Sequence, residues 1–413
     1  MENVYIVGVG MTPFGRHMDK SDKQLTAIAV REALADAGID GNEIAAAFYG
    51  NCGQGYMQGQ HMTRGQVALL PVGLQGIPIV NVENACATAS TAFHMAVSYL
   101  RSGMAEVAIA VGTEKMYNTD KAKMFGVFDS AVDVERTDEI LGRFKSMGAS
   151  VERPAGSESP RPYSPFMGVY AGFGRMFIER YGITQRDLAV IAAKNHTHAK
   201  HNERAQYRDP MTPEEVLAAP PITYPLTLPM CSPISDGSAA AIVCTESALA
   251  KHGFDRRRAV KVLASVMRSA SARAAEDLDH HVAKLAAKRA YEMAGVGPQD
   301  VNVAEVHDAT AMGELMQTEM LGLCGPGEGG AFARAGETSL GGRVPVNPSG
   351  GLESKGHPIG ATGLGQIYEL VSQLRGECGP RQVEGARIAL QENGGGIWGI
   401  EEAAAHIGIY GRA

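Results

Sequence analysis

A cysteine and two histidines are the residues of this chain that are best suited to chemistry. Cys86 follows a short apolar run at residues 77–80 and precedes small and apolar residues that recur at three- and four-residue steps. This spacing places Cys86 at or just before a helix N-terminus, where unpaired N–H groups and the helix dipole favour an anion. We therefore expect its thiol to lose its proton more easily than an ordinary thiol. A small buried cysteine packed at a strand–helix junction is the competing interpretation.

The two histidines lie in separate motifs of the second half of the chain. His307 belongs to EVHDAT at residues 305–310, and His357 belongs to NPSGGLESKGHPIGATG at residues 347–363. A thiol and a histidine are the minimum set for nucleophilic acyl transfer, because the histidine takes the thiol proton and the thiolate attacks a carbonyl. Backbone N–H groups or a second histidine then hold the oxyanion. Together the three residues favour catalysis over packing as the role of Cys86.

Alternating strands and helices are predicted to position these residues. In the first half the expected strands are residues 4–9, 44–49, 77–82 and 107–111, with helices at 22–38, 63–70 and after Cys86. In the second half the expected strands are residues 260–266, 301–306, 386–390 and 404–410, with helices at 278–293, 312–323 and 360–374. This alternation implies parallel pairing with helices on both faces. Two similarly ordered halves suggest a pseudo-twofold pair of sheets, in which Cys86 and His357 could face each other.

Residues 118–221 interrupt the alternation with methionines, prolines, charges and helical fragments. We interpret them as a lobe inserted over one end of the sheet, because long insertions of this kind often form lids or binding surfaces. The chain is thus expected to divide into a first half (residues 1–117 and 222–250), the inserted lobe (118–221) and a second half (251–413).

Composition narrows the class of protein. The 413 residues carry a net charge of −7, which argues against a nucleic-acid surface. The six cysteines form no CxxC pair, so neither disulfides nor a structural zinc site are expected. No apolar run is long enough to span a membrane, and the N-terminus reads as a strand rather than a signal peptide. The C-terminal IYGRA is not a peroxisomal tripeptide, so a cytoplasmic location is predicted.

The motifs resemble those of the thiolase superfamily. They are NACATAS around Cys86, CSPISDGS at 231–238, VHDAT at 306–310, SGGLESKGHPIGATG at 349–363 and a glycine cluster near the C-terminus. The closest resemblance is to the sterol-carrier, or SCP-x-like lipid-transfer, branch, which carries His-Asp where other thiolases have Asn-Glu. It implies an α/β thiolase fold: two βαβαβαββ-type halves in a five-layer αβαβα arrangement with an inserted loop domain. It also implies a homodimer or homotetramer.

The resemblance assigns roles to individual residues. By it, Cys86 is the acyl-accepting nucleophile, His357 is its base, and His307 helps to hold the thioester oxyanion. The amides of Cys86 and Gly395 would form a second oxyanion hole for the acyl-enzyme. Coenzyme A and acyl-CoA are implied as substrates, with no tightly bound cofactor and no metal. The positions that the resemblance places beside CoA or beside the catalytic histidine are Ser232, Ser349 and Gly350.

One departure from the thiolase pattern affects the carbon–carbon step. Thiolases use a second acid/base, commonly a cysteine, and both usual places lack one here: Asn393 and Ala309 stand there. His307, or Glu392 if it turns inward, could replace it. Three functions stay open: an acyltransferase, an acyltransferase or condensing subunit active only with a small OB-fold (DUF35-type) partner, and a non-catalytic carrier of acyl-CoA or lipid.

Other features have ordinary interpretations. His196, His198 and His201 are predicted to lie on a solvated helix face rather than to bind a metal. Residues 256–258, three arginines, are predicted to form a surface turn rather than to contact CoA phosphates. Cys52, in a glycine-rich loop, is expected to be structural.

Overall fold

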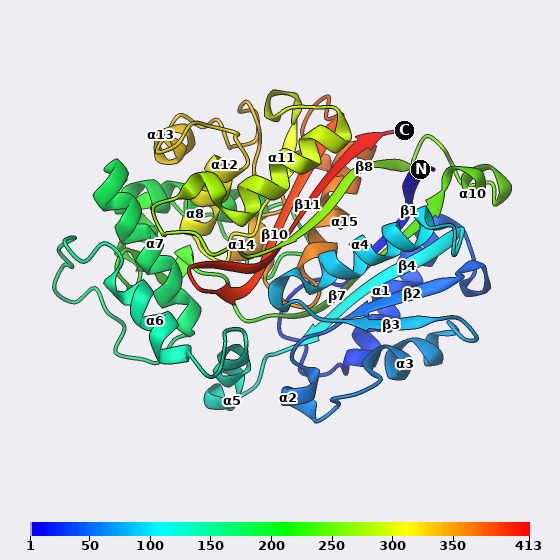
Figure 1. The fold of residues 1–413 in the computed structure, drawn as a ribbon, viewed down its shortest axis with the longest axis horizontal. Helices are drawn as coiled ribbons and strands as arrows, with labels where there is room; N and C mark the ends of the chain where they lie inside the picture. Colours follow the sequence, from blue (N-terminus) through cyan, green and yellow to red (C-terminus); the bar gives the residue numbers. More distant parts are fainter. Residues whose placement is uncertain (1) are drawn as a thin grey trace.

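The computed structural model describes residues 2–413, which form two α/β halves and an inserted helical lobe (Figure 1). In Figure 1 the first half is blue to cyan apart from β7, which is green like the lobe, and the second half runs from yellow-green to red. The strands of the first half are β1 (Val4–Met11), β2 (Ala46–Gly50), β3 (Ile79–Val82), β4 (Val107–Lys115) and β7 (Asp236–Thr245). Those of the second half are β8 (Val260–Ser269), β9 (Val303–Glu305), β10 (Ile388–Trp398) and β11 (Glu401–Arg412).

The strands form one nine-stranded mixed sheet in the order β3-β2-β4-β7-β1-β8-β11-β10-β9. The two halves meet where β1 and β8 pair antiparallel over only two residue pairs, Tyr5 with Lys261 and Ile6 with Val260. Parallel pairing holds β2 between β3 and β4 and joins β9 to β10, whereas the other pairs are antiparallel. The sequence predicted parallel pairing and two separate sheets. The long hairpin of β10 and β11 and the return of β7 after the lobe explain the antiparallel pairs.

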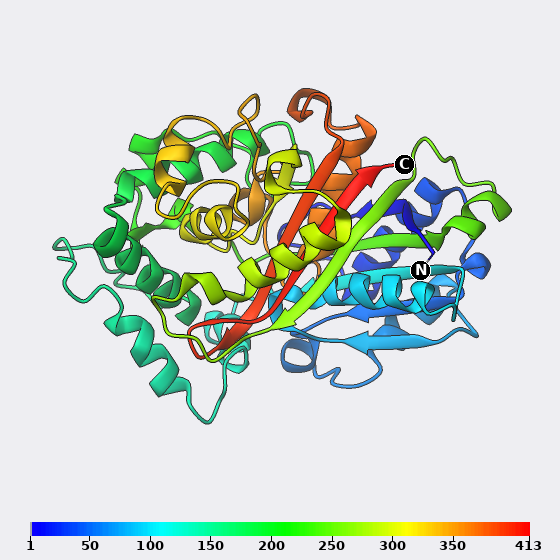
Figure 2. The same cartoon turned by 45° about the horizontal axis from the view of Figure 1, so that its top comes forward.

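Helices cover the sheet in layers, as the thiolase fold requires. Helices α4 (Thr88–Arg101) and α15 (Thr362–Arg375) lie together in the core between the two halves of the sheet. Helices α1 (Asp22–Ala37) and α3 (Arg64–Leu69) cover the outer face of the first half. Helix α11 (Val282–Ala294) covers the outer face of the second half, where Figure 2 shows it lying along β8 and β11. The resulting order of layers is αβαβα, which confirms the predicted fold class.

Hydrophobic periodicity explains why α4 and α15 occupy the middle layer. In α4 the residues Ala89, Ala92, Phe93, Ala96 and Val97 are buried at three- and four-residue steps. The strands alternate in the same way: Val4 and Ile6 of β1 face the middle layer, while Tyr5 and Val7 face α1. Both faces of the sheet are therefore covered, and loops at the ends of α4 and α15 meet beside the sheet.

The inserted lobe packs against the second half of the chain. Its helices are α5 (Lys121–Gly126), α6 (Thr137–Ser146), α7 (Pro165–Tyr181), α8 (Gln185–Ala199) and α9 (Pro213–Ala218), followed by the short hairpin β5 (Pro221–Thr223) and β6 (Leu226–Thr227). One apolar core joins α7 and α8 to α12 (Ala311–Met320). The remaining short helices are α2 (Gln54–Gln58), α10 (Glu246–Lys251), α13 (Gly329–Arg334) and α14 (Gly351–Lys355). None of the helices within residues 2–413 combines the length and hydrophobicity needed to cross a bilayer.

Candidate active site

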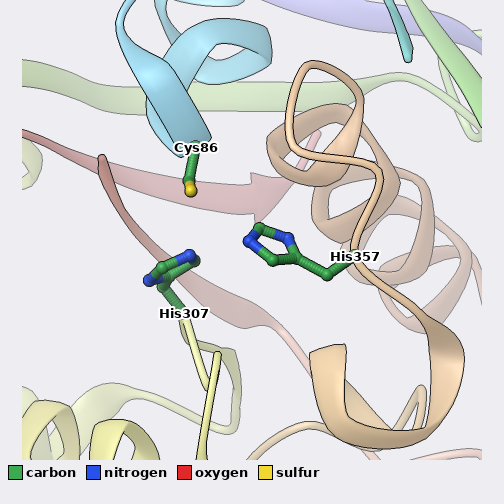
Figure 3. A group of neighbouring side chains, drawn as sticks. All are labelled: Cys86, His307 and His357. Atoms are coloured by element: carbon green, nitrogen blue, oxygen red, sulfur yellow. The ribbon is translucent and has the colours of Figure 1, made fainter. Parts of the chain in front are cut away.

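Cys86, His307 and His357 come together at the point where the two halves and the lobe meet (Figure 3). Cys86 lies in the turn before α4, His307 follows β9, and His357 precedes α15. The cysteine Sγ and one nitrogen of each ring lie within 4.8 Å of one another, and the ring centroids are 5.1 Å apart. The predicted meeting of Cys86 with His357 is thus observed, and His307 joins them.

The turn that carries Cys86 is held by close backbone contacts. Residues Ala85–Ala87 form a 3₁₀ turn, and Ala85 has a φ of +46°, which is uncommon for a residue with a side chain. The Cys52 thiol donates a hydrogen bond to the Ala85 carbonyl over 3.1 Å. Gly395 of β10 lies so close that an added Cβ would be 2.3 Å from the Asn84 carbonyl oxygen. Sheet and turn therefore fix where the sulfur sits.

The thiol of Cys86 is not easily ionised, which corrects the prediction from its place at a helix start. Burial, and then the negative charge of Glu83, raise the pKa of Cys86 to about 12. Hydrogen bonding by the backbone N–H groups of Gly396 and of Cys86 itself lowers this pKa by less. Gly396, whose amide is one of these two, is the neighbour of the predicted Gly395. At neutral pH the thiol is protonated, so attack on a carbonyl requires a base.

His357 is fixed as a proton acceptor. Its backbone N–H donates to Ser235 Oγ at 3.0 Å, and its ring Nδ1 lies 2.7 Å from Thr362 Oγ1. Because the Thr362 hydroxyl donates to the Pro358 carbonyl, Nδ1 must carry the hydrogen and Nε2 keeps its lone pair. Burial and the neighbouring His307 hold the pKa of His357 well below its usual value. The ring is therefore neutral and able to accept the thiol proton.

His307 is arranged as a hydrogen-bond donor. Its backbone N–H donates to Glu392 Oε2 at 2.9 Å, and its Nδ1 lies 3.4 Å from the Tyr170 hydroxyl. Its Nε2 is buried and has no hydrogen-bond partner within residues 2–413. Burial lowers the pKa of His307 to about 4, so the ring is neutral. In the tautomer in which the Tyr170 hydroxyl donates to Nδ1, the hydrogen lies on Nε2 and can meet a substrate oxygen.

A buried polar network supports both histidine loops. Glu305 accepts hydrogen bonds from the Ser349 hydroxyl at 2.7 Å and from Lys355 Nζ at 3.0 Å. Asp308, next to His307, accepts from the Leu352 N–H at 2.7 Å and so ties the two loops to each other. These residues are essentially inaccessible to solvent. We use the name polar network for Glu305, Asp308, Ser349 and Lys355.

A cavity of about 1290 Å³ opens onto the three side chains. Cys86, His307, His357, Gly395 and Ser232 line it. Ser349 and Gly350, predicted to lie in the loop beside the catalytic histidine or to contact CoA, do not line it: Ser349 belongs to the polar network, and Gly350 packs on α8. The lobe contributes an apolar wall made of Met124, Phe125, Phe128, Tyr163, Phe166, Met167, Tyr170 and Phe173.

The two places expected to hold a second acid/base are filled differently. Ala309 lines the cavity but has no titratable group. Asn393 does not line it: its Oδ1 accepts a hydrogen bond from Ser90 Oγ at 2.7 Å on the side of the middle helices. Glu392 also lies outside the cavity. Reasoning from the sequence missed Tyr170, Cys52 and Glu402, all of which line it.

Other sequence predictions have mixed outcomes. His196 and His198 are buried, so the predicted solvated face is wrong for them, whereas His201 is exposed. Their ring nitrogens lie within hydrogen-bond distance of the carbonyls of Pro229 and Asn347, since the polar side of α8 packs inward. The arginines at 256–258 pair with nearby acids on the surface, as predicted, and do not line the cavity. Basic residues that do line it are Arg16, Lys121 and Arg161.

The three site residues form the one group of His, Cys, Asp and Glu side chains in the described part of the chain with spacing that suits a metal ion. A thiol binds metals as the thiolate, and the raised pKa of Cys86 opposes that form. Proton transfer between neutral groups is the chemistry that this arrangement favours.

Comparison with known proteins agrees with the geometry. Thiolase, N-terminal domain, matches residues 4–219, and thiolase C-terminal domain-like matches residues 264–407. Sterol carrier protein 2 of Rattus norvegicus is 38% identical over 403 residues, covering 95% of this chain and 70% of that protein. Acetyl-CoA acetyltransferase of Methanothermobacter thermautotrophicus is 36% identical over 409 residues, covering 98% and 99%. The solved structure described as Ltp2-ChsH2(DUF35) aldolase has a TM-score of 0.78 at 23% identity, covering 99% of this chain and 98% of that one.

Proposed function

Because the chain belongs to the thiolase family, in the branch of sterol carrier protein 2, we propose that it is a CoA-dependent acyltransferase. It would form an acyl thioester on Cys86 and transfer the acyl group to CoA or to a carbon nucleophile. The observation that carries this proposal is the meeting of the Cys86 sulfur with the ring nitrogens of His307 and His357 in one large cavity.

Each of the three side chains has a step that its surroundings suit. His357 Nε2 takes the thiol proton as Sγ attacks the substrate carbonyl, since Thr362 keeps the other ring nitrogen protonated. His307 Nε2–H donates to the oxyanion that forms on the thioester. The amides of Cys86 and of the Gly395–Gly396 segment are the candidates for the oxyanion of the acyl-enzyme. In this scheme CoA is a substrate, and no bound cofactor or metal takes part.

The mouth of the cavity has features that suit a CoA ester. Ser232 is partly exposed at the wall, where it could meet a pantetheine arm. Arg16, Lys121 and Arg161 are exposed basic residues of the rim, and CoA phosphates are anionic. We propose these three residues, together with Ser232, as the contacts of CoA within the cavity.

The size and lining of the cavity favour a bulky acyl group. Its volume exceeds the ordinary range of small-molecule sites, roughly 300–1000 Å³. Phe128, Phe166 and Phe173 offer aromatic faces, and Met124 and Met167 adapt to irregular shapes. We infer that an aromatic or polycyclic acyl chain fits this wall better than an acetyl group does.

Assembly and location remain proposals. Strand β3 is an open edge of the sheet, and Val80 and Met95 expose apolar surface beside it, which supports a homodimer or homotetramer. The similar Ltp2-ChsH2(DUF35) structure supports testing a small OB-fold partner. The division at residues 1–117 with 222–250, 118–221 and 251–413 and a cytoplasmic location also stay predictions.

Mass spectrometry of the intact protein tests the proposal. After incubation with acetoacetyl-CoA or benzoyl-CoA, we expect a mass increase of one acyl group that maps to the peptide of Cys86. Cys86→Ala should abolish the adduct, whereas Cys324→Ala, a control thiol outside the cavity, should retain it. An adduct that persists in Cys86→Ala would reject the proposal. Tight binding of the esters without any adduct would favour a non-catalytic carrier, and an adduct that forms only after adding an OB-fold chain would favour the partner-dependent enzyme.

A further inference from the structure

Carbon–carbon bond chemistry needs a group that exchanges a proton with the substrate α-carbon. Neither of the two expected positions supplies such a group. Asn393 accepts a hydrogen bond from Ser90 outside the cavity, and the side chain of Ala309 has no exchangeable proton. His357 is committed to the thiol, and His307 is placed to donate to an oxygen. A different titratable group must therefore lie in the cavity if the chain makes or breaks a carbon–carbon bond.

We propose that Glu402 is the residue that exchanges this proton, an inference that rests on the proposed acyl transfer at Cys86. Glu402 lies in the hairpin of β10 and β11, opposite Ile397, and lines the same cavity as Cys86 and Tyr170. Its side chain crosses Gly394, where an added Cβ would be 2.7 Å from the Glu402 Cγ. Only glycine at position 394 leaves room for the Glu402 side chain to take this course.

One oxygen of the Glu402 carboxyl group accepts a hydrogen bond, and the other accepts none from the described part of the chain. Oε1 accepts a hydrogen bond from Gln317 Nε2 at 2.9 Å. Oε2 is buried and has no hydrogen-bond partner within residues 2–413, although His281 Nε2 lies 3.4 Å away. The residue as a whole is only 6% exposed. A buried polar atom without a partner is costly, and a carboxyl beside a cavity regains a partner when substrate binds.

The surroundings of Glu402 allow both protonation states near neutral pH. Burial is the main cause that raises the pKa of Glu402 to about 7, and the nearby Glu401 adds to it. Arg273 opposes the rise weakly, because it is paired with Glu401. The charged or titratable groups that face it are Glu392 of β10, Glu401 of β11, Tyr170 of α7, Arg273 of the loop after β8 and His281 just before α11.

Glu392, the carboxyl considered from the sequence, is less suitable. It lies outside the cavity, and its Oε2 is occupied by the His307 N–H. Its role is to position His307. Of the two, Glu402 is the carboxyl that lines the cavity, and its Oε2 accepts no hydrogen bond from the described residues, with His281 Nε2 at 3.4 Å.

The proton balance can be written for cleavage of a 3-oxoacyl-CoA. Cys86 Sγ bonds to C3 after giving its proton to His357, and the C2–C3 bond breaks. The electron pair stays on C2, which takes the proton of Glu402 to give acetyl-CoA. The thiol of a second CoA returns a proton to the Glu402 carboxylate, and its sulfur attacks the acyl thioester. Cys86 leaves as a thiolate and regains its proton from His357. Condensation is the reverse.

Hydrogen exchange at acetyl-CoA isolates the proposed step. In D₂O the native protein should incorporate deuterium at C2 of acetyl-CoA, followed by mass spectrometry. Glu402→Gln should slow this exchange by about 100-fold or more, as expected for loss of a general base. Acetylation of Cys86 by 4-nitrophenyl acetate, whose leaving group needs no proton, should stay within about threefold of native. Glu402→Asp, which keeps a carboxyl, should recover part of the exchange.

Glu319→Gln is a matched control. Glu319 is also a buried glutamate with a raised pKa, but it caps the chain at Gly327 and Gly329 away from the cavity, so exchange should be unchanged. Native exchange in Glu402→Gln, or no exchange in the native protein, would overturn the role of Glu402. Equal loss of acetylation and exchange in both Glu402 variants would show a structural role instead. Absence of acetylation in the native protein would reject the acyltransferase proposal itself.

Discussion

The cavity has two walls that are built in different ways. One wall carries His307 and His357 from the second half of the chain, and hydrogen bonds to threonine, serine and glutamate side chains fix both histidines. The other wall comes from the inserted lobe and consists of aromatic and methionine side chains that pack on one another, as Phe128 does on Phe166. The first wall fixes the positions of the histidine ring nitrogens, whereas the second determines the shape of the space left for an acyl group. We therefore expect changes in the histidine wall to affect chemistry and stability, and changes in the lobe wall to affect which acyl group binds.

The largest effect is expected from His357→Ala. Removing the base for a thiol with a pKa of about 12 should lower the rate of Cys86 acylation by about 10²–10⁴-fold. Stopped-flow release of 4-nitrophenolate measures this rate. Thr362→Val should have a smaller effect in the same direction, because it keeps the ring but frees its Nδ1 hydrogen. A native rate in His357→Ala would mean that another group ionises the thiol.

A large loss of stability is expected from Glu305→Ala. The change leaves the Lys355 ammonium, which is 1% exposed, without its carboxylate and should lower the free energy of unfolding by about 3–5 kcal/mol. Urea titration followed by circular dichroism measures it. Glu139→Ala in the lobe removes an exposed pair with Arg136 and should leave the transition midpoint nearly unchanged. Equal effects from both variants would show that the polar network behind the histidine wall contributes no more to stability than an exposed ion pair of the lobe.

A moderate and selective effect is expected from Phe166→Ala in the lobe wall. Removing this ring should raise the KM for benzoyl-CoA by roughly tenfold while changing kcat little, since the ring contacts the acyl group and not the reacting atoms. The KM for acetyl-CoA should change less. An equal loss for both esters, or a fall in kcat alone, would show that the lobe wall also orders the catalytic side chains.

The smallest effect is expected from mild acid. The pKa of His357 lies below its usual value of about 6.5, so the ring stays neutral when the pH falls from 8 to 6. Cys86 acylation by 4-nitrophenyl acetate should change less than about twofold over that interval, with the acid limb at lower pH.

The C2 exchange should instead fall as pH drops through about 7, because a protonated Glu402 is no longer a base. A shared midpoint for both steps would mean that one group serves both.

The sequence predicted the histidine wall well but did not single out Glu402 of β11. Cys86 and His357 stand in motifs whose residues contact one another in the folded chain, so local pattern and position carry the information. Glu402 follows Glu401 near the C-terminus and reads as a solvated charge pair. Its burial arises only when β10 and β11 pair and α12 covers them.

The same reason explains two errors of prediction. The thiol is expected to ionise because helix position is local, whereas the burial that raises the pKa of Cys86 comes from segments that are distant in the sequence and line the same cavity. His196 and His198 were placed on a solvated face because α8 contains charged residues. One of these, Lys194, instead pairs with Glu314 of α12 in the interior, so the polar side of the helix is the buried one.

Gly395 limits which mutations this chain can accept without losing the position of its nucleophile. Its Cα touches the nucleophile turn so closely that a single methyl group would meet the Asn84 oxygen and the Ala87 nitrogen, at 2.3 and 2.4 Å. Substitution there would displace the sulfur without altering any group that reacts. In homologous sequences that evolve from this chain, replacement of this glycine would therefore indicate loss of acyl transfer, even where the cysteine and both histidines are kept.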